Sequence, residues 1–220
     1  MNSPETRSSY AIVMLAAGSS TRMGTPKQLL LYEGKPLIRH AAEVALRTAC
    51  DALVVVLGAN AQQIRLALEG LDFGAKPVVV VDNPRWPEGM GTSIQAGMQA
   101  VERLGMEGAI LALADQPFIT PEILNHLAEE HIRTGQPIVA SEYAGTVGVP
   151  VFFAKSHFPQ LAALAPDQGC KGVILKNGDW ALRVSCPEAE IDIDTPADYD
   201  HLAKLAPAEP ETKQREALRK

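Results

Sequence analysis

Short apolar runs alternate with stretches of helical periodicity through the first 134 residues. The runs are rich in β-branched or aliphatic side chains, as buried strands are, and span residues 11–15, 52–57, 77–81 and 109–113. Between and after them, amphipathic stretches with helical spacing span residues 36–49, 61–69, 92–104 and 121–134. Because strand and helix alternate, the sequence predicts an α/β fold with a doubly wound, parallel sheet.

The alternation weakens after residue 135. Strand-like segments at residues 137–143, 147–153 and 180–186 are separated by one or two short helices, which indicates antiparallel strands and a substrate-binding part. With no internal repeat or long linker, we expect a single domain over residues 10–205. The charged tail at residues 206–220 should fray or form partial helix.

Two helix starts are marked by a threonine followed by proline. Thr120 precedes Pro121 and Thr195 precedes Pro196, so each pair places a hydroxyl at the N-cap and a proline at the first helical position. Asp198 completes a Thr-x-x-Asp capping box.

Charge and composition exclude several classes of protein. The chain has 220 residues, with 20 Lys and Arg against 26 Asp and Glu, and its net charge of −6 argues against nucleic-acid or anionic-membrane partners. Residues 1–10 do not resemble a secretory signal, and no apolar run approaches the roughly 20 residues of a membrane helix. Three scattered cysteines indicate neither a disulfide framework nor a zinc site, and the five histidines lack metal-ligand spacing. We expect a cytoplasmic protein.

A loop of small residues follows the first strand and ends in two cations. In residues 15–27, Leu-Ala-Ala-Gly-Ser-Ser-Thr-Arg-Met-Gly-Thr-Pro-Lys, backbone N–H groups can approach an anion while Arg22 and Lys27 contact phosphate. The alternative is an ordinary turn with solvated surface cations, and we expect Lys27 to face solvent. The spacing of Gly18 and Gly24 matches neither the dinucleotide fingerprint nor the Walker loop.

Three aspartates are candidates for holding a metal ion. Asp115 follows the fourth predicted strand, where open α/β sheets bind ligands, and a carboxylate there suits Mg²⁺; the alternative is a turn-forming Asp. Asp192 and Asp194 flank Ile193 on an extended segment, so both carboxylates point to one side and can share a cation. The alternative for Asp194 is a structural role at a helix N-terminus.

A second glycine-containing segment, residues 89–94, is typical of a loop that opens a helix. Thr92 or Ser93 can cap its exposed N–H groups, and a helix N-terminus suits an anion. The alternative is a flexible loop, with Trp86 merely covering the core.

The pattern Leu-Ala-Ala-Gly-x-Ser-x-Arg-Met-Gly-x-x-Lys at residues 15–27 resembles the opening signature of the molybdenum cofactor nucleotidyltransferase family. Residues 83–94, 113–117 and 192–196 are similar to three further segments of that family, in the same order. The resemblance spans about residues 11–205. It implies a Rossmann-like, mostly parallel sheet with a small antiparallel acceptor-binding part, as in nucleotide-diphospho-sugar transferases.

The resemblance is closest to the cytidylyltransferase branch, which implies transfer of CMP from CTP to molybdopterin or molybdenum cofactor, with Mg²⁺ bound and pyrophosphate released. It implies catalytic roles for Arg22, Lys27 and Asp115, and metal binding by Asp115 and at least one of Asp192 and Asp194. It also implies a nucleotide pocket that includes Arg22, Lys27 and the following residues: Leu15, Ala16, Ala17, Gly18, Gly89, Met90 and Ser93. Guanylyl-transferring relatives typically have glycine where this chain has Ala17, so we expect CTP to be preferred over GTP, with another nucleoside triphosphate as the alternative.

One segment departs from the family pattern. Where relatives usually have Gly-Asp-x-Gly-Ala-Arg, residues 166–171 are Pro-Asp-Gln-Gly-Cys-Lys. We expect Asp167, Gly169 and Lys171 to bind the acceptor, although lysine lacks the bidentate geometry of arginine. Cys170 is either a reactive thiol or, as we expect, a small packed side chain.

Two other functions compete with this prediction. One is a nucleotidyltransferase that acts on a sugar or polyol phosphate. The other is a noncatalytic chaperone that binds the cofactor for a molybdoenzyme. Expected partners are therefore a nucleoside triphosphate, a molybdopterin-type acceptor, and a molybdoenzyme or its chaperone.

Overall fold

A seven-stranded sheet forms the centre of the molecule in the computed structural model, which describes residues 9–71 and 74–205. The strand order is β5-β4-β1-β6-β8-β7-β9. Its strands are β1 (Tyr10–Ala16), β4 (Ala52–Leu57), β5 (Val78–Asp82), β6 (Gly108–Leu113), β7 (Ile138–Tyr143), β8 (Thr146–Ala154) and β9 (Ala181–Ser185). The α/β prediction is confirmed, and the four early strands lie within a residue or two of their expected positions.

Strand direction separates the two halves of the sheet. β5, β4, β1 and β6 are parallel to one another, whereas β8 is antiparallel to both β6 and β7. β7 and β9 are again parallel to each other. The predicted antiparallel part is thus a single reversed strand, inserted into the same sheet.

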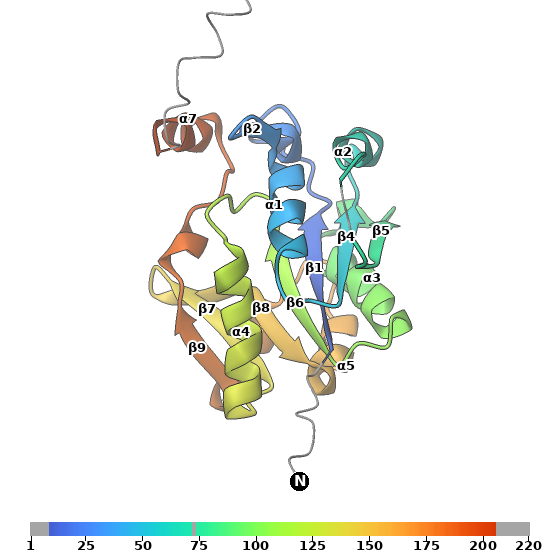
Figure 1. Cartoon of the computed structure of the whole chain (residues 1–220), viewed down its shortest axis with the longest axis vertical. Helices are drawn as coiled ribbons and strands as arrows, with labels where there is room; N and C mark the ends of the chain where they lie inside the picture. Colours follow the sequence, from blue (N-terminus) through green and yellow to red (C-terminus); the bar gives the residue numbers. More distant parts are fainter. Residues whose placement is uncertain (1–8, 72–73, 206–220) are drawn as a thin grey trace, which may run out of the picture.

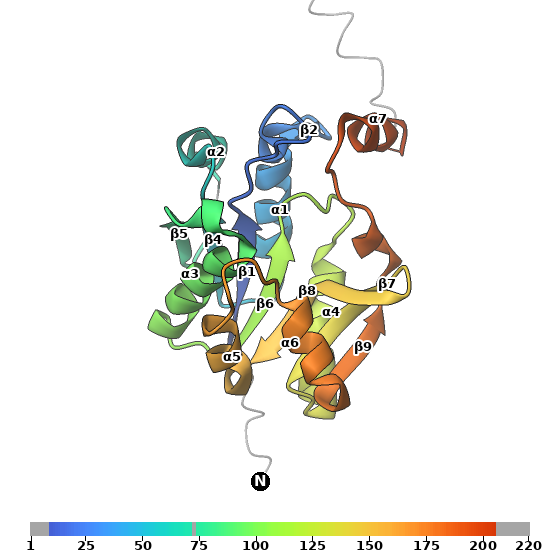
Figure 2. The same cartoon turned by 180° about the vertical axis from the view of Figure 1, so that it is seen from behind.

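Helices cover both faces of the sheet. The elements α1 (Leu37–Leu46) and α4 (Pro121–Thr134) lie on one face, and α3 (Met90–Arg103), α5 (Phe158–Ala162) and α6 (Lys171–Lys176) lie on the other (Figures 1 and 2). β1 shows why two cores form: Ile12 and Met14 pack into the core beneath α1 and α4, while Ala11 and Val13 pack into the core beneath α3. This alternation follows from the two-residue period of a strand.

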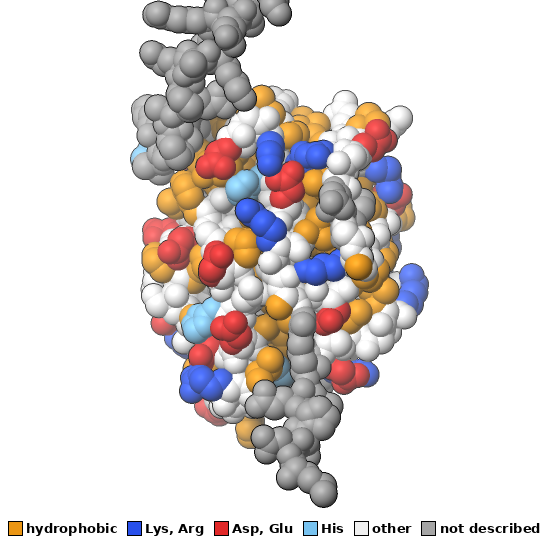
Figure 3. Space-filling model, in the orientation of Figure 1, with side chains coloured by type: hydrophobic (Ala, Val, Ile, Leu, Met, Phe, Trp, Pro, Cys, Tyr) orange, Lys and Arg blue, Asp and Glu red, His pale blue; other side chains and the backbone are white. Residues whose placement is uncertain are grey.

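Three smaller elements lie at the edge of the sheet where the parallel strands end: α2 (Ala61–Ala67), α7 (Pro196–Leu205), and a hairpin of β2 (Leu31–Tyr32) and β3 (Lys35–Pro36) (Figure 1). The sequence did not predict the hairpin, whose strands are only two residues long. On the face seen in Figure 3, acidic and basic side chains are interspersed. No helix in the described ranges is long and apolar enough to cross a membrane.

The predicted helix starts are confirmed at α4 and α7. Thr120 Oγ1 accepts a hydrogen bond from Ile123 N at 3.4 Å. At α7, Asp198 Oδ2 accepts from Thr195 N at 2.7 Å while Asp198 N donates to Thr195 Oγ1 at 3.3 Å, which is a reciprocal capping box. The expectations for residues 1–8 and for the tail at residues 206–220 lie outside the described residues.

Chain order places a switch point between β1 and β6. From β1 the chain moves outward through β4 to β5, then returns by α3 to β6 on the other side of β1. The connections diverge there, so a crevice opens beyond the carboxyl ends of β1 and β6. The loop after β1 and Asp115 after β6 both lie at this crevice.

Candidate active site

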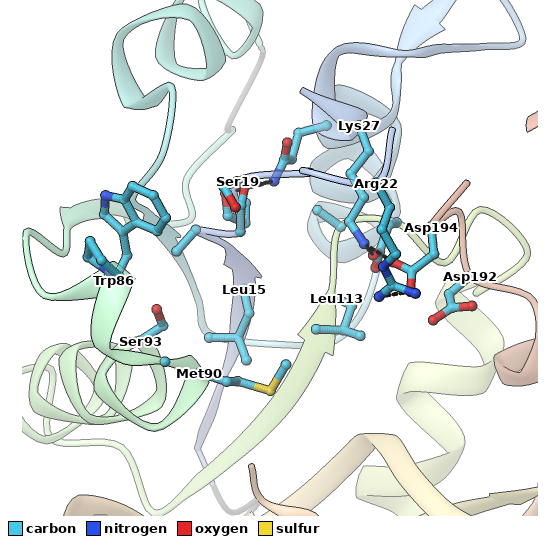
Figure 4. A pocket seen from close by; sticks show the side chains of 18 residues that line it. Leu15, Ser19, Arg22, Lys27, Trp86, Met90, Ser93, Leu113, Asp192 and Asp194 are labelled. Carbon is cyan, nitrogen blue, oxygen red and sulfur yellow. Dashed lines mark hydrogen bonds and ion pairs between the residues drawn. The ribbon is translucent and has the colours of Figure 1, made fainter. Parts of the chain in front are cut away.

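A cavity of about 480 Å³ lies at the switch point. Its lining includes every residue predicted to bind nucleotide or metal: Leu15, Ala16, Ala17, Gly18, Arg22, Lys27, Gly89, Met90, Ser93, Asp115, Asp192 and Asp194. Figure 4 shows its two sides, with Trp86, Met90 and Ser93 on one, and Lys27, Arg22, Asp192 and Asp194 on the other. Segments more than 150 residues apart in the sequence therefore share one pocket.

Lys27 is the centre of a charge cluster rather than a solvent-facing side chain. Its Nζ forms an ion pair with Asp115 Oδ2 and lies 2.7 Å from Asp194 Oδ1, and only 17% of its side chain is exposed. Arg22, whose side chain is exposed, reaches Asp194 Oδ2 at 2.7 Å. The expectation of a solvated Lys27 is thus wrong, because the fold brings two carboxylates from distant segments against it.

The charge cluster shifts the pKa values of its members. Burial alone lowers the pKa of Lys27, but the carboxylates of Asp115 and Asp194 outweigh burial and raise that pKa above its ordinary value. The hydrogen bond from Lys27 lowers the pKa of Asp194. Both shifts favour the charged forms, so the ion pair between Lys27 and Asp194 persists across neutral pH.

Asp192 and Asp194 point to the same side of their segment, as their spacing predicted. Ile193 between them is fully buried, and its backbone N donates to Asp115 O at 3.1 Å. Removal from water, followed by the charges of Asp115 and Asp194, raises the pKa of Asp192. The three carboxylates therefore repel one another, and a cation placed among them would relieve that repulsion.

The carboxylates of Asp115, Asp192 and Asp194 could hold a divalent cation if the side chain of Lys27 moved away from them. Asp115 Oδ1 is buried and has no hydrogen-bond partner in the described part of the chain, which is the condition of an oxygen awaiting a ligand. As the side chains stand, residues 9–71 and 74–205 contain no ready-made group of three metal-ligating side chains. Asp115 and one of Asp192 and Asp194 would supply oxygen ligands of the kind Mg²⁺ and Mn²⁺ prefer.

Trp86 forms one wall of the pocket, packed against Gly58. A Cβ added at Gly58 would lie 2.6 Å from Trp86 Cβ and 2.7 Å from Ala17 O, so only glycine allows this approach. Trp86 belongs to a short 3-10 helix, η2 (Trp86–Glu88), that precedes α3. It is half-buried and lines the cavity.

The start of α3 differs from the sequence prediction. The helix begins at Met90 with Gly89 as N-cap, so Thr92 and Ser93 lie inside its first turn and do not cap it. Thr92 Oγ1 instead donates to Gly89 O at 2.8 Å, and Asn83 Nδ2 donates to the Thr92 and Ser93 hydroxyls at 2.9 and 3.0 Å. Asn83, which the sequence reasoning did not select, thereby fixes the end of β5 against the pocket wall.

The predicted acceptor residues lie beside the pocket. Asp167, Gly169 and Lys171 are not among the residues that line the cavity, but their segment packs against the start of α3. Gly91 N donates to Pro166 O at 2.9 Å, and a Cβ added at Gly91 would lie 2.1 Å from the carbonyl oxygen of Ala165.

Cys170 in this segment is a packed side chain. It is 5% exposed, and burial raises the pKa of its thiol to about 12. The thiol therefore stays protonated and unreactive, as we expected.

Sequence reasoning also missed Gln28. This residue lines the cavity, is 2% exposed and hydrogen-bonds the loop after β1. The available signal was a lone polar residue between Lys27 and the apolar residues 29–31.

Fold and pocket together define an α/β protein with a cavity at the sheet's switch point, in which cations and carboxylates form ion pairs. The chain matches the MobA-like NTP transferase domain over residues 12–180. It belongs to that family and is a nucleotidyltransferase.

Relatives of the chain have varied names. The purine catabolism protein PucB of Bacillus subtilis (strain 168) is 30% identical over 88% of this chain and 96% of the relative. The nicotine blue oxidoreductase of Paenarthrobacter nicotinovorans is 32% identical over 83% of this chain and 91% of the relative. The molybdenum cofactor cytidylyltransferase of Escherichia coli (strain K12) is 24% identical over 85% and 92%. The manganese complex of Rv0371C from Mycobacterium tuberculosis H37Rv superposes with a TM-score of 0.71 at 28% identity, covering 89% of this chain and 98% of that one.

Proposed function

We propose that this nucleotidyltransferase transfers CMP from CTP to a molybdopterin-type acceptor, with Mg²⁺ as its metal. The observation that carries the proposal is the pocket itself, where Lys27 and Arg22 form ion pairs with Asp115 and Asp194 beside the loop after β1. Asp192 lines the same cavity. The cytidylyltransferase of E. coli supports the choice of acceptor and nucleotide.

The chemistry requires positioning more than covalent participation. An oxygen of the acceptor phosphate attacks the α-phosphorus of CTP, the bond from that phosphorus to the bridging oxygen breaks, and pyrophosphate leaves with the bond electrons. Mg²⁺, when bound, neutralises charge on the phosphate oxygens. Arg22 and Lys27 stabilise the departing pyrophosphate, and the backbone of the loop after β1 orients the triphosphate. An ionised phosphate needs no general base.

Asp167, Gly169 and Lys171 are proposed to hold the acceptor. Their segment lies next to Met90, since a Cβ added at Gly169 would be 3.5 Å from Met90 Sδ. An acceptor bound along this segment would therefore approach the cavity from the Met90 side. Lys171 would meet a phosphate with a single charge rather than a bidentate fork.

Four nucleoside triphosphates, each with Mg²⁺ and molybdopterin, test the function. We expect pyrophosphate release with CTP and a product whose mass exceeds that of molybdopterin by one CMP unit. Product formed only with a sugar or polyol phosphate would replace the proposed acceptor. Tight binding of cofactor without pyrophosphate release in any mixture would instead indicate a noncatalytic chaperone.

Base preference is proposed to depend on Ala17. This side chain is 6% exposed and lines the pocket, so its Cβ takes space that a larger purine would need. Ala17→Gly should lower the CTP to GTP ratio of kcat/KM by about tenfold, because one methyl group in a pocket is worth roughly 1–3 kcal/mol. An unchanged ratio, or a wild-type preference for GTP, would contradict this role.

A further inference from the structure

Gln28 is a buried amide in the pocket wall. It belongs to a 3-10 helix, η1 (Lys27–Leu29), is 2% exposed, and lies directly after Lys27. A buried amide normally finds its hydrogen-bond partners inside the protein. The partners of Gln28 therefore show which part of the structure it holds in place.

Both ends of the Gln28 amide contact the loop after β1. Its Nε2 donates to Ala16 O at 3.2 Å and to Gly18 O at 3.0 Å, and Ser20 Oγ donates to its Oε1 at 3.4 Å. The same Ser20 hydroxyl accepts a hydrogen bond from Lys27 N at 3.0 Å. The loop is thereby closed onto the segment that carries Lys27.

These contacts occupy carbonyl oxygens that would otherwise repel phosphate. Ala17 O accepts a hydrogen bond from Ala59 N at 3.0 Å, so the three successive carbonyls of Ala16, Ala17 and Gly18 are all held by internal donors. A carbonyl oxygen carries partial negative charge, whereas backbone N–H groups attract anions. A loop whose carbonyls are held in this way cannot turn them toward a bound triphosphate.

We propose that Gln28 is a positioning residue: it acts through the loop after β1 and keeps that loop in a shape that accepts a triphosphate. The inference rests on the proposed function, because it assumes that the pocket binds the phosphates of a nucleotide. Gln28 itself takes no part in bond making or breaking. Its loss should weaken binding of the phosphate chain whatever base is attached.

Gln28→Met in the full chain tests the proposal, since methionine has similar length but cannot make these hydrogen bonds. The matched control is Gln95→Met in α3, where Gln95 Nε2 donates to Leu164 O at 2.7 Å, away from the loop. Calorimetry would measure the Kd of three probes, each with Mg²⁺: inorganic tripolyphosphate, CTP and GTP. We expect Gln28→Met to weaken binding of all three probes by about tenfold or more and by similar factors, because the three hydrogen bonds between Gln28 and the loop are lost. Gln95→Met should leave each Kd within twofold of wild type.

Two further measurements separate positioning from a purely structural role. Amide hydrogen exchange at residues 16–20 should be faster in ligand-free Gln28→Met than in wild type. Ser20→Ala removes one contact to Gln28 and should weaken tripolyphosphate binding by a smaller factor than Gln28→Met. This variant tests the proposal if Gln28→Met does not fold. A folded Gln28→Met variant that binds all three probes within twofold of wild type would overturn the inference. If Gln28→Met does not fold, a Ser20→Ala variant with the wild-type Kd for tripolyphosphate would overturn it. If wild type binds none of the probes, the proposed function falls and this inference falls with it.

Discussion

Lys27 balances the charge of the pocket before any ligand arrives. Its ammonium lies between the carboxylates of Asp115 and Asp194, in the position that a metal ion would need. Asp115 is almost fully buried, with 8% of its side chain exposed, and its ion pair with Lys27 offsets the loss of contact with water. Lys27 is therefore an internal counter-ion in the empty pocket, and under the proposed function it would become a phosphate contact when nucleotide binds.

Lys27→Met should reduce the free energy of unfolding in the absence of metal and nucleotide. The buried Asp115 carboxylate loses its cation, which should cost roughly 1–3 kcal/mol. Urea unfolding at pH 7 measures the change. In an Asp115→Asn background the cost of Lys27→Met should shrink, because the charge it compensates is gone. Equal costs in the two backgrounds would show that the ion pair does not stabilise the fold.

Asp192→Asn should stabilise the ligand-free protein at neutral pH. The folded-state pKa of Asp192 is raised above the ordinary value of 3.8, so its ionisation costs stability as pH rises through that raised pKa. The gain from Asp192→Asn should be complete above the folded-state pKa and vanish below pH 3.8. Thermal unfolding from pH 3 to pH 8 follows the change. A gain that is the same at pH 3 and pH 7 would rule out this electrostatic cause.

At the scale of single elements, α3 is the helix on which the pocket depends most. Its first turn supplies Met90 and Ser93 to the cavity, and its middle lies against the sheet at Gly97. A Cβ added at Gly97 would lie 2.5 Å from Val13 Cγ1 and 3.1 Å from Val56 Cγ2. The helix approaches β1 and β4 as closely as it does because this position has no side chain.

Gly97→Ala should destabilise the protein even though alanine favours helix. Helix propensity contributes about 1 kcal/mol in favour of alanine, but overpacking a core usually costs 1–3 kcal/mol and the neighbouring Val13 belongs to a fully buried strand. Gly172→Ala in α6 is the matched control, since a Cβ there meets nothing within 4 Å. Urea unfolding should show a loss for Gly97→Ala and a small gain for Gly172→Ala. A gain in stability for both variants would mean that Val13 and Val56 move aside at little cost.

For the whole molecule, ligand binding and stability are linked through the charge cluster. Under the proposed function, Mg²⁺ alone would compete with Lys27 for the carboxylates, whereas a nucleotide would offer Lys27 and Arg22 a new set of anionic partners. Metal and nucleotide should therefore stabilise the protein together more than either does separately.

Thermal unfolding with Mg²⁺, with CTP and with both should reveal this dependence. Mg²⁺ alone should barely change Tm, while both ligands at about 100 times the nucleotide Kd should raise it by about 5–10 °C. Asp115→Asn should remove most of the combined gain while leaving the protein folded. A rise in Tm of about 5–10 °C with Mg²⁺ alone would show that Lys27 does not occupy the metal position.

The sequence predicted the elements better than the contacts between them. The apolar runs located β1, β4, β5 and β6, because buried parallel strands have a strong local pattern. The carboxyl ends of those strands also predicted where the loop and Asp115 would meet. The local pattern of a strand does not reveal its neighbours in the sheet. The position of the reversed strand β8 between β6 and β7 was therefore not predicted.

The same limit applies inside the site. Residue types and spacing identified Lys27, Asp115 and Asp194 as candidates, but not the ion pairs that join them across more than 80 positions of sequence. Gln28 lacked an obvious chemical role, since a neutral amide acquires one only through its partners. Residues that act by holding others become visible only when the fold is known.

The contact between α3 and the segment at residues 165–168 determines how this chain could be re-engineered for another acceptor. Gly91 sits so close to the carbonyl of Ala165 that position 91 tolerates no side chain. A substitution that shifted the backbone at Ala165 would therefore displace the start of the helix and damage the pocket. If the segment binds the acceptor as proposed, diversity is better introduced from Asp167 onward, with Ala165 and Pro166 kept, so that acceptor choice can change while the start of α3 stays in place.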